Sequence, residues 1–217
     1  MIYIFLGVPG AGKGTIASKL VNEKNFKHIS TGDVFRENIR NKTKIGLEVE
    51  KLIAEGNLVP DELTNKIATQ KILEFNNNDK LILDGYPRTI DQAKYLDKFL
   101  SDNQSFISGV IYMDADQDVV IKRISSRFLS ENGTTHNSLI EKIIEEKGKF
   151  YLSDGTKLSR RADDEPINVK QRFVEYVNKT SPLLKYYEEK GIVSKVDSNK
   201  DIDTIFNSIV DSIESFN

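Results

Sequence analysis

Short apolar runs recur along the chain, separated by longer segments in which apolar residues are three or four positions apart. The apolar runs have the length of strands and lie at residues 2–6, 81–83, 110–113 and 192–196, with a weaker run at 28–29. The helical spacing is clearest near the C-terminus, at Ile205, Ile209, Val210 and Ile213. Strands that alternate with helices are typical of βαβ units. The pattern therefore predicts an α/β fold of three layers, with helices on both faces of a central parallel sheet.

Two stretches interrupt this alternation. Residues 31–59 contain two short helical patterns and no convincing strand, which predicts a small helical insertion between sheet elements. Residues 127–164 are polar and irregular, with the turn sequences NGTTHNS and SDGTKLS on either side of a short amphipathic piece at 139–144. A segment of this length without regular structure is usually functional or disordered, and the turn residues favour a small folded lid.

The composition narrows the classes of function. The 217 residues suit one core with small insertions. A formal net charge of −2, from 31 basic and 33 acidic side chains, gives no global positive field and disfavours a nucleic-acid-binding protein. Without cysteines the chain has no disulfide, thiolate nucleophile or thiolate zinc site, and two histidines are too few for an imidazole cage. No apolar run approaches the length of a membrane span, so we expect no membrane contact and a cytoplasmic location.

The strongest motif follows the first predicted strand. Residues 7–15 read GVPGAGKGT, and such glycines let backbone N–H groups turn toward phosphate oxygens at the start of a helix. Lys13 is placed to neutralise the β and γ phosphates of a nucleotide. The alternative is a glycine-rich turn with a surface lysine. Gly14 follows the lysine and the hydroxyl comes only at Thr15, a departure from the usual GTPase and motor ATPase motif.

Two further segments follow predicted strands. STGDVFR at residues 30–36 is, taken alone, a good helix N-terminus. The second segment is LILDGYPRT at residues 81–89, in which an apolar strand ends at Asp84. From this position a carboxylate helps to hold magnesium, directly or through water. The glycine and proline that follow predict a tight turn that presents Arg88.

These motifs together resemble a known family. The spacing of GVPGAGKGT resembles the nucleoside monophosphate kinases, and ISTGDVFR, GNLVPDE, LDGYPRTIDQA, RRADD and VDSNKDI occur in the order typical of adenylate kinases. The resemblance implies a P-loop fold with a five-stranded parallel sheet. It implies the reversible reaction of MgATP and AMP to two ADP. It also implies a core domain of residues 1–30, 60–121 and 165–217, an AMP-binding domain of residues 31–59 and a lid domain of residues 122–164.

The resemblance also implies site residues. On the ATP side these are Gly10, Ala11, Gly12, Lys13, Gly14, Thr15, Arg123, Arg127 and Lys200. On the AMP side they are Thr31, Arg36, Ile53, Asn57, Val59, Gly85, Arg88, Gln92, Arg161 and Arg172. Asp84 is expected to hold Mg²⁺ through water. The implied catalytic residues are Lys13, Arg88, Arg123, Arg161 and Arg172. We expect Arg160 and His28 to be ordinary polar or structural residues.

The expected chemistry explains why arginines are numerous. An oxygen of the AMP phosphate is already ionised at neutral pH, so the reaction needs no general base. Catalysis must bring two polyanions together and stabilise the transferred group, and the planar arginine fork suits that task. A closing lid would keep water away from the activated phosphate. Asp163 and Asp164 are expected to orient these arginines or to couple lid and core, the alternative being solvated charges at a helix start.

Many adenylate kinases hold the lid together with zinc bound to cysteines. This chain has no cysteines. Near the positions of the zinc-binding cysteines it has Ser130, Asn132, Tyr151 and Asp154, and the spacing before Gly133 is one residue shorter than in those relatives. We therefore expect a hydrogen-bond network and no zinc site, with His136 an ordinary polar residue of the lid.

Other functions remain open at this point. The nearest is another nucleoside monophosphate kinase that uses UMP or CMP as acceptor or GTP as donor; Thr31, Gln92 and the long lid favour AMP. A second is a nucleotide-binding regulatory module without catalysis, which the lysine and the full arginine set disfavour. The expected ligands are ATP, AMP and ADP, and the family resemblance implies a monomer.

Overall fold

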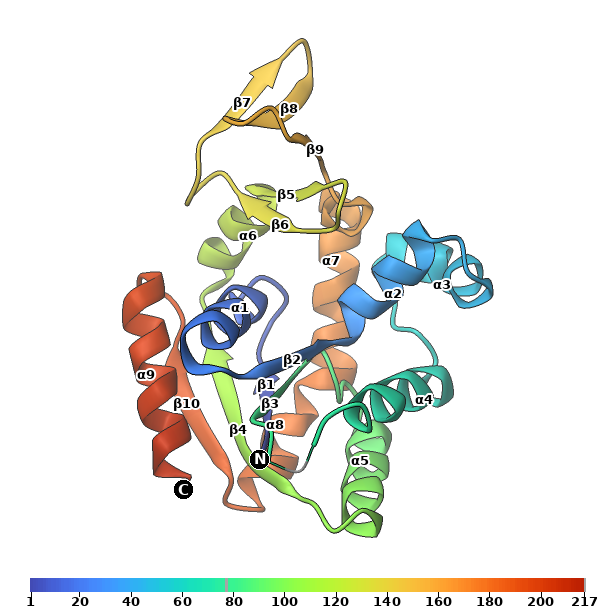
Figure 1. Ribbon diagram of the computed structural model, residues 1–217, viewed down its shortest axis with the longest axis vertical. Coiled ribbons are helices and arrows are strands. Elements are labelled where there is room, and N and C mark those ends of the chain that lie inside the picture. The colour runs from blue at the N-terminus through green and yellow to red at the C-terminus, as the bar shows by residue number, and fades with distance from the viewer. Residues whose placement is uncertain (77, 217) are drawn as a thin grey trace.

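The computed structural model of the protein describes residues 1–76 and 78–216. Its central sheet has the strand order β10-β4-β1-β3-β2, and every neighbouring pair is parallel (Figure 1). The predicted α/β fold with a five-stranded parallel sheet is confirmed. The strands are β1 (Ile2–Leu6), β2 (Lys27–Ser30), β3 (Leu81–Asp84), β4 (Ile107–Asp114) and β10 (Val193–Asp197).

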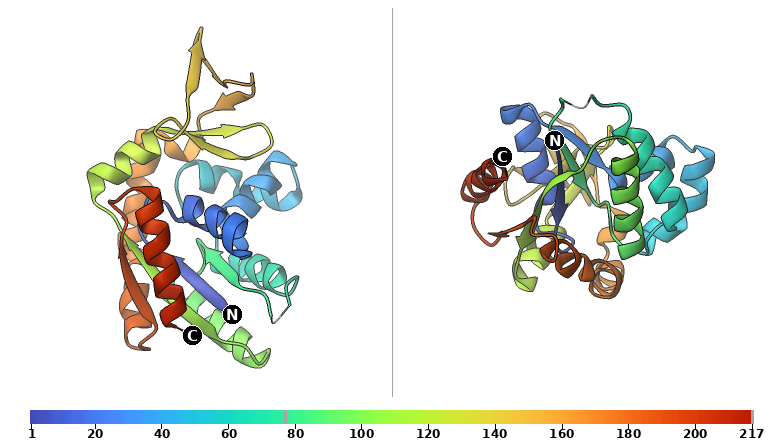
Figure 2. Two further views of the ribbon diagram at one scale, coloured as in Figure 1. Left: turned by 60° about the vertical axis from the view of Figure 1, so that its left-hand side comes forward. Right: turned by 90° about the horizontal axis from the view of Figure 1, so that it is seen from below.

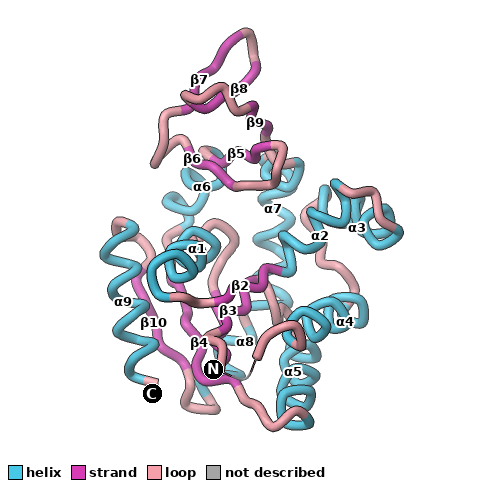
Figure 3. Tube along the Cα trace, viewed as in Figure 1, coloured by secondary structure: helices cyan, strands magenta, loops and turns pink. Residues whose placement is uncertain are grey.

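Helices cover both faces of this sheet, as the right-handed crossovers between parallel strands require (Figures 2 and 3). Helices α1 and α9 pack on one face, and α4, α5 and α8 pack on the other. The α-helices outside residues 31–59 are α1 (Lys13–Lys24), α4 (Asp61–Ile72), α5 (Ile90–Asp102), α6 (Gln117–Ser125), α7 (Pro166–Glu175), α8 (Pro182–Glu188) and α9 (Ile202–Ser215) among the described residues. A 3₁₀ turn, η1 (Ala162–Asp164), precedes α7, and a π-helical turn, η2 (Tyr176–Thr180), joins α7 to α8.

Strand β1 is buried on both sides, because successive side chains of a strand point to opposite faces. Ile2, Ile4 and Leu6 pack toward α4, α5 and α8. Tyr3 and Phe5 pack toward α1 and α9. This explains why the strand reads as a continuous apolar run, and it places the end of β1 at the centre of the sheet's carboxyl edge, where ligands bind in open α/β folds.

The predicted insertion at residues 31–59 contains two helices, α2 (Thr31–Arg40) and α3 (Lys44–Ala54). Ser30 and Thr43 cap them by accepting hydrogen bonds from the N–H groups of Asp33 and Gly46. Phe35 and Val49 pack in a small apolar cluster with Val59 and with Ile67 of α4. The helices lie to one side of the sheet's carboxyl edge (Figure 1).

A second sheet lies beyond that carboxyl edge, at the top of Figure 1. Its strands are antiparallel, in the order β6-β5-β9-β8-β7. The amphipathic piece of the sequence leads into strand β7. The Phe128 and Phe150 rings pack at an angle of 56° with their centroids 4.8 Å apart, and the Arg160 guanidinium lies 3.8 Å from the Phe128 centroid. The strands are β5 (Arg127–Ser130), β6 (Thr135–Asn137), β7 (Ile143–Glu146), β8 (Lys149–Leu152) and β9 (Lys157–Ser159).

Within the described residues, none of the helices combines the length and the apolar character needed to span a membrane.

Candidate functional site

A cavity of about 1040 Å³ lies between the carboxyl edge of the central sheet, helices α2 and α3, and the second sheet. It is lined by backbone of the glycine-rich loop and by side chains from segments far apart in the sequence. Every residue that the sequence placed at a nucleotide or magnesium site lines it: Gly10, Ala11, Gly12, Lys13, Gly14, Thr15, Thr31, Arg36, Ile53, Asn57, Val59, Asp84, Gly85, Arg88, Gln92, Arg123, Arg127, Arg161, Arg172 and Lys200.

The glycine-rich loop connects β1 to α1, as the motif predicts. Gly10 needs its hydrogen side chain, because its φ is +90° and a Cβ there would lie 2.7 Å from Cγ1 of Val120. Lys13 folds back over the loop, and its Nζ donates hydrogen bonds to the carbonyl oxygens of Gly7 and Val8 at 2.7 and 3.0 Å. Burial lowers the pKa of Lys13 to about 8, and repulsion by nearby arginines adds to this effect. The loop thus presents a cation and the positive end of α1 to the cavity.

Asp84 ends β3 beside this loop, and its Oδ2 lies 3.7 Å from the position of a Cβ on Gly14. Burial alone would raise the pKa of the Asp84 carboxyl. The His28 ring and the Lys13 ammonium outweigh burial, and the net pKa lies below its ordinary value. An ionised carboxylate beside a glycine-rich loop fits the oxygen-ligand preference of Mg²⁺, so Asp84 could hold this cation.

His28, which the sequence predicts to be structural, lies beside Asp84. Its Nε2 is buried, lies 3.6 Å from Oδ2 of Asp84 and has no hydrogen-bond partner among the described residues. His28 also lines the cavity. The alternation of strand β2 could have given a signal: His28 and Ser30 point to the same face, and Ser30 pairs with Asp84 across the sheet.

The acceptor side of the cavity is built on the turn after β3. The carbonyl oxygen of Gly85 accepts hydrogen bonds from Oγ1 of Thr31 and from Nε of Arg88, both at 2.8 Å. Arg36 is paired with Asp33 one turn earlier on α2. The Gln92 side chain, 1% exposed, lies between this turn and α4. The turn and α2 thereby aim two guanidinium groups into one cavity.

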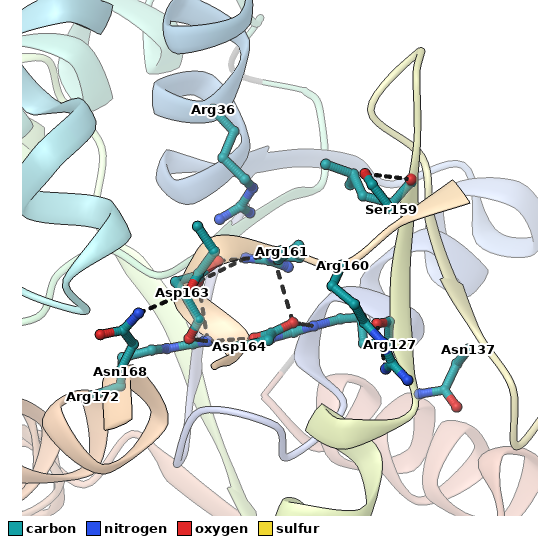
Figure 4. Close-up of polar contacts among 12 residues, drawn as sticks. Arg36, Arg127, Asn137, Ser159, Arg160, Arg161, Asp163, Asp164, Asn168 and Arg172 are labelled. Carbon is teal, nitrogen blue, oxygen red and sulfur yellow. Dashed lines mark hydrogen bonds and ion pairs between the residues drawn. The ribbon is translucent and has the colours of Figure 1, made fainter. Parts of the chain in front are cut away.

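Three arginines and two aspartates form a polar cluster (Figure 4); Arg127, Arg161, Asp163 and Arg172 line the cavity, whereas Asp164 does not. Nε of Arg127 donates to Oδ2 of Asp164 at 2.7 Å, and Nη1 of Arg172 donates to Oδ1 of the same carboxylate at 2.8 Å. Arg161 binds Asp163 through two hydrogen bonds of 3.2 Å. The side chain of Asp164 is only 3% exposed, so the solvated-charge alternative for this aspartate is wrong.

Burial and neighbouring charges shift the pKa values of several groups in the arginine cluster. Burial, reinforced by neighbouring guanidinium groups, lowers the pKa of both Arg88 and Arg161. Burial would raise the pKa of Asp163, but the surrounding arginines hold it far below its ordinary range. Because burial disfavours their charged forms, these cations are suited to a partner that carries several negative charges, and a polyphosphate is such a partner.

Arg123 joins the loop to the segment after β10. Its Nη1 donates to the carbonyl oxygen of Ala11 at 3.2 Å and its Nη2 to that of Lys200 at 3.3 Å.

Arg160 does not line the cavity. It donates to the carbonyl oxygens of Ser125 and Arg127 and packs on Phe128, which is a structural role in the second sheet.

A polar network holds the first turn of the second sheet. Oγ of Ser130 donates to Oδ1 of Asn132 at 2.7 Å and lies 3.2 Å from Nε2 of His136, whose Nδ1 lies 3.1 Å from Glu141. Tyr151 and Asp154 take no hydrogen bond in this network; Oδ1 of Asp154 accepts from the N–H of Thr156 instead. Across residues 1–76 and 78–216, His, Asp and Glu side chains form no group of three or more that could hold a metal ion.

Comparison with known proteins adds independent information. A family model described as adenylate kinase matches residues 5–192. The chain is 39% identical over 210 residues to the adenylate kinase of Enterococcus faecalis, covering 96% of this chain and 97% of the relative. It is 40% identical to that of Lactiplantibacillus plantarum, covering 96% and 95%, and 38% identical to that of Thermosipho africanus, covering 98% and 99%.

Proposed function

The chain belongs to the adenylate kinase family and is an ATP:AMP phosphotransferase, and from this premise we propose how its residues divide the work. The triphosphate of ATP binds along the loop of residues 7–15, with Lys13 and Arg123 on its phosphates and the backbone near Lys200 at the adenine. AMP binds between α2, α3 and the turn after β3. The backbone N–H groups and the helix end support the first assignment, and the paired guanidinium groups of Arg36 and Arg88 support the second.

We also propose that the chain is organised in three domains that match these binding regions. Residues 1–30, 60–121 and 165–217 form the core, residues 31–59 the AMP-binding domain and residues 122–164 the lid. Two observations support it: helices α2 and α3 pack around a small apolar cluster that is separate from the two clusters of the central sheet and also contains Ile67 of α4, and the second sheet pairs only within residues 127–159 among the described strands.

In the proposed reaction an oxygen of the AMP phosphate attacks the γ-phosphorus of ATP. The new P–O bond forms as the bond to the β–γ bridging oxygen breaks, the electron pair leaves with ADP, and no proton has to move. Arg88, Arg161 and Arg172 stabilise the charge on the group in transfer, while Lys13 and Arg123 stabilise the leaving phosphates. Catalysis is therefore positioning and electrostatics.

Asp84 is proposed to hold Mg²⁺ through water, and Thr15 in the first turn of α1 lines the same cavity. When bound, the cation neutralises the charge of the phosphate chain. The contribution of the protein is an ionised carboxylate, held in place by β3 and flanked by His28 and Lys13. The polar network of Ser130, Asn132 and His136 supports the lid in place of zinc, and the closed lid keeps water from the γ-phosphate.

The physiological assignments follow from the reaction. We propose that the chain interconverts ATP, AMP and ADP in purine nucleotide metabolism, as a cytoplasmic monomer without a nucleic-acid or membrane partner. The near-zero net charge supports the absence of nucleic-acid binding.

The observation that carries these roles is the convergence of Lys13 and six arginines on one cavity. The test compares Arg88→Ala with Arg40→Ala, an exposed arginine of α2 outside the cavity lining. With ATP and AMP, Arg88→Ala should lower kcat by about 100-fold or more, with little change in thermal stability. Arg40→Ala should stay close to wild type. Equal losses in the two variants would contradict the assignment.

A further inference from the structure

We propose that Asp61 is a positioning residue that fixes the orientation of the Gln92 side-chain amide, that is, the places of its nitrogen and its oxygen. The fixed amide thereby sets a preference for an acceptor nucleotide with a 6-amino purine over one with a 6-oxo purine. This inference rests on the proposed role of Gln92 in the AMP site. Asp61 is the first residue of α4 and lies 31 positions away from Gln92 on α5.

Two partners hold the Gln92 amide. Its Nε2 donates to Oδ1 of Asp61 at 2.8 Å, and its Oε1 accepts from the backbone N–H of Arg88 at 2.7 Å. The other carboxylate oxygen of Asp61 accepts from Oγ1 of Thr89 at 2.7 Å, which fixes the carboxylate in turn. Gln92 lines the cavity, whereas Asp61 does not, so the hydrogen bond to Gln92 connects Asp61 to the cavity.

The chemistry of these partners sets the orientation of the amide. An ionised carboxylate only accepts hydrogen bonds, and a backbone N–H only donates them. Rotation of the Gln92 amide by 180° would place its oxygen against Asp61 and its NH₂ against the N–H of Arg88. Both contacts would then be repulsive at a site that is almost wholly buried, where an unpaired polar group is costly.

The fixed orientation has a consequence for the base. After these two bonds the amide has one N–H donor and one oxygen lone pair left for a ligand. Adenine offers a donor at its 6-amino group and an acceptor at N1, whereas a 6-oxo purine offers an acceptor at position 6 and a donor at N1. An amide that cannot rotate pairs well with one of these edges only. Because Asp61 prevents the rotation, it helps to exclude the 6-oxo base.

Asp61 could instead serve only as a negative charge at the N-terminus of α4, where Glu62 lies next to it. Glu62→Gln is therefore the matched control, because it removes an exposed carboxylate from the same helix end. Asp61→Asn keeps the size of the side chain, but its amide can turn either a donor or an acceptor toward Gln92. The variant thus removes one of the two constraints on orientation and leaves the packing in place.

The experiment measures kcat/KM with AMP and with IMP at fixed MgATP, using a readout of ADP formation that does not depend on the acceptor. For Asp61→Asn, the AMP:IMP ratio should fall about tenfold, mainly through a higher KM for AMP, while the KM for ATP stays unchanged. Glu62→Gln should keep the wild-type ratio. If Asp61→Asn does not fold, Asp61→Ser tests the same point, since a hydroxyl also donates and accepts. An unchanged ratio in the folded Asp61 variant would overturn the inference.

Gln92→Ala separates this inference from the proposed function on which it rests. If Gln92→Ala leaves the AMP:IMP ratio unchanged, the proposed role of Gln92 is wrong, and the inference fails with it. If Gln92→Ala lowers the ratio and Asp61→Asn does not, only the inference about Asp61 is wrong. If both lower the ratio, Asp61→Asn should add no further loss in the Gln92→Ala background, because Asp61 acts through Gln92.

Discussion

The guanidinium of Arg127 and the carboxylate of Asp164 lie face to face, joined by two hydrogen bonds, one of them 2.7 Å between Nε and Oδ2. Arg172 binds the same carboxylate from the last turn of α7, and Nε of Arg161 lies 3.9 Å from it. One buried carboxylate therefore holds together arginines from β5, from the residue before η1 and from α7.

Asp164→Asn should destabilise the nucleotide-free protein. Removing one partner of a buried ion pair leaves like charges uncompensated, and we expect the free energy of unfolding to fall by about 3 kcal/mol. The loss should shrink when a polyphosphate ligand supplies negative charge to the same arginines. Urea denaturation with and without a dinucleotide that joins two adenosines through five phosphates measures both quantities. Asp211→Asn, an exposed position within α9, is the control and should change neither. A full-sized loss in the presence of the ligand would contradict this view.

Lys13 should take up a proton when a triphosphate binds near pH 8.5. Its pKa of about 8 lies below the ordinary value of 10.5, so the free protein is partly deprotonated there, and phosphate charge should raise the pKa. Isothermal titration calorimetry in buffers of different ionisation enthalpy counts the protons. Uptake should be absent at pH 6.5 and in Lys13→Met, and its absence at pH 8.5 in the wild type would refute the prediction.

The same shift affects stability. Because the folded pKa of Lys13 lies below the unfolded value, the unfolded chain binds more protons between pH 8 and 10.5. The contribution of Lys13 to the free energy of unfolding should therefore increase with pH in that window. Comparison of wild type with Lys13→Met isolates this contribution from the other titrating groups.

Asp84→Asn should shift the magnesium dependence of the reaction. The amide cannot supply the negative charge that a carboxylate presents to the cation, so half-maximal activity should need about tenfold more Mg²⁺. His28→Gln should have a smaller effect, since it leaves the carboxylate in place. Activity titrated with Mg²⁺ at constant ATP measures this, and identical curves for wild type and Asp84→Asn would remove Asp84 from the magnesium site.

The polar network of the second sheet should stabilise it without metal. Treatment with a zinc chelator in excess Mg²⁺ should leave the melting temperature unchanged. Ser130→Ala should accelerate amide hydrogen exchange in β5 and β6 without affecting β1, because only the second sheet loses a hydrogen bond. Stoichiometric zinc in the purified protein, with a lower melting temperature after chelation, would contradict this account.

Much of the fold could be predicted from local patterns. The buried strand β1 reads as an unbroken apolar run, and the glycines and Lys13 follow it directly, so the loop and its position at the sheet's carboxyl edge could both be inferred. The side-chain contacts that orient and charge the site residues join positions far apart in the sequence. Asp61 meets Gln92 only because helices α4 and α5 pack together, and no spacing in the sequence indicates this pair. The approach of His28 to Asp84 depends on which strands are neighbours in the sheet, so the alternation within β2 gives only half of the information.

The arginine cluster shows the same limit. The RRADD motif indicated which arginine belongs to the site, but it could not show that Asp164 is buried, since aspartates near a helix start are usually solvated. The partners of Ser130 in the second sheet were likewise uncertain, because several polar residues at similar spacing could have formed the network.

The central claim is that one cavity holds donor and acceptor together, with Lys13 and the arginines between them. Calorimetric titration with the dinucleotide that joins two adenosines through five phosphates tests it most directly. We predict one molecule bound per chain, displacement of both ATP and AMP, and an affinity that falls at least about 100-fold in Lys13→Met and in Arg88→Ala. Binding of two molecules per chain, or displacement of ATP alone, would contradict the claim.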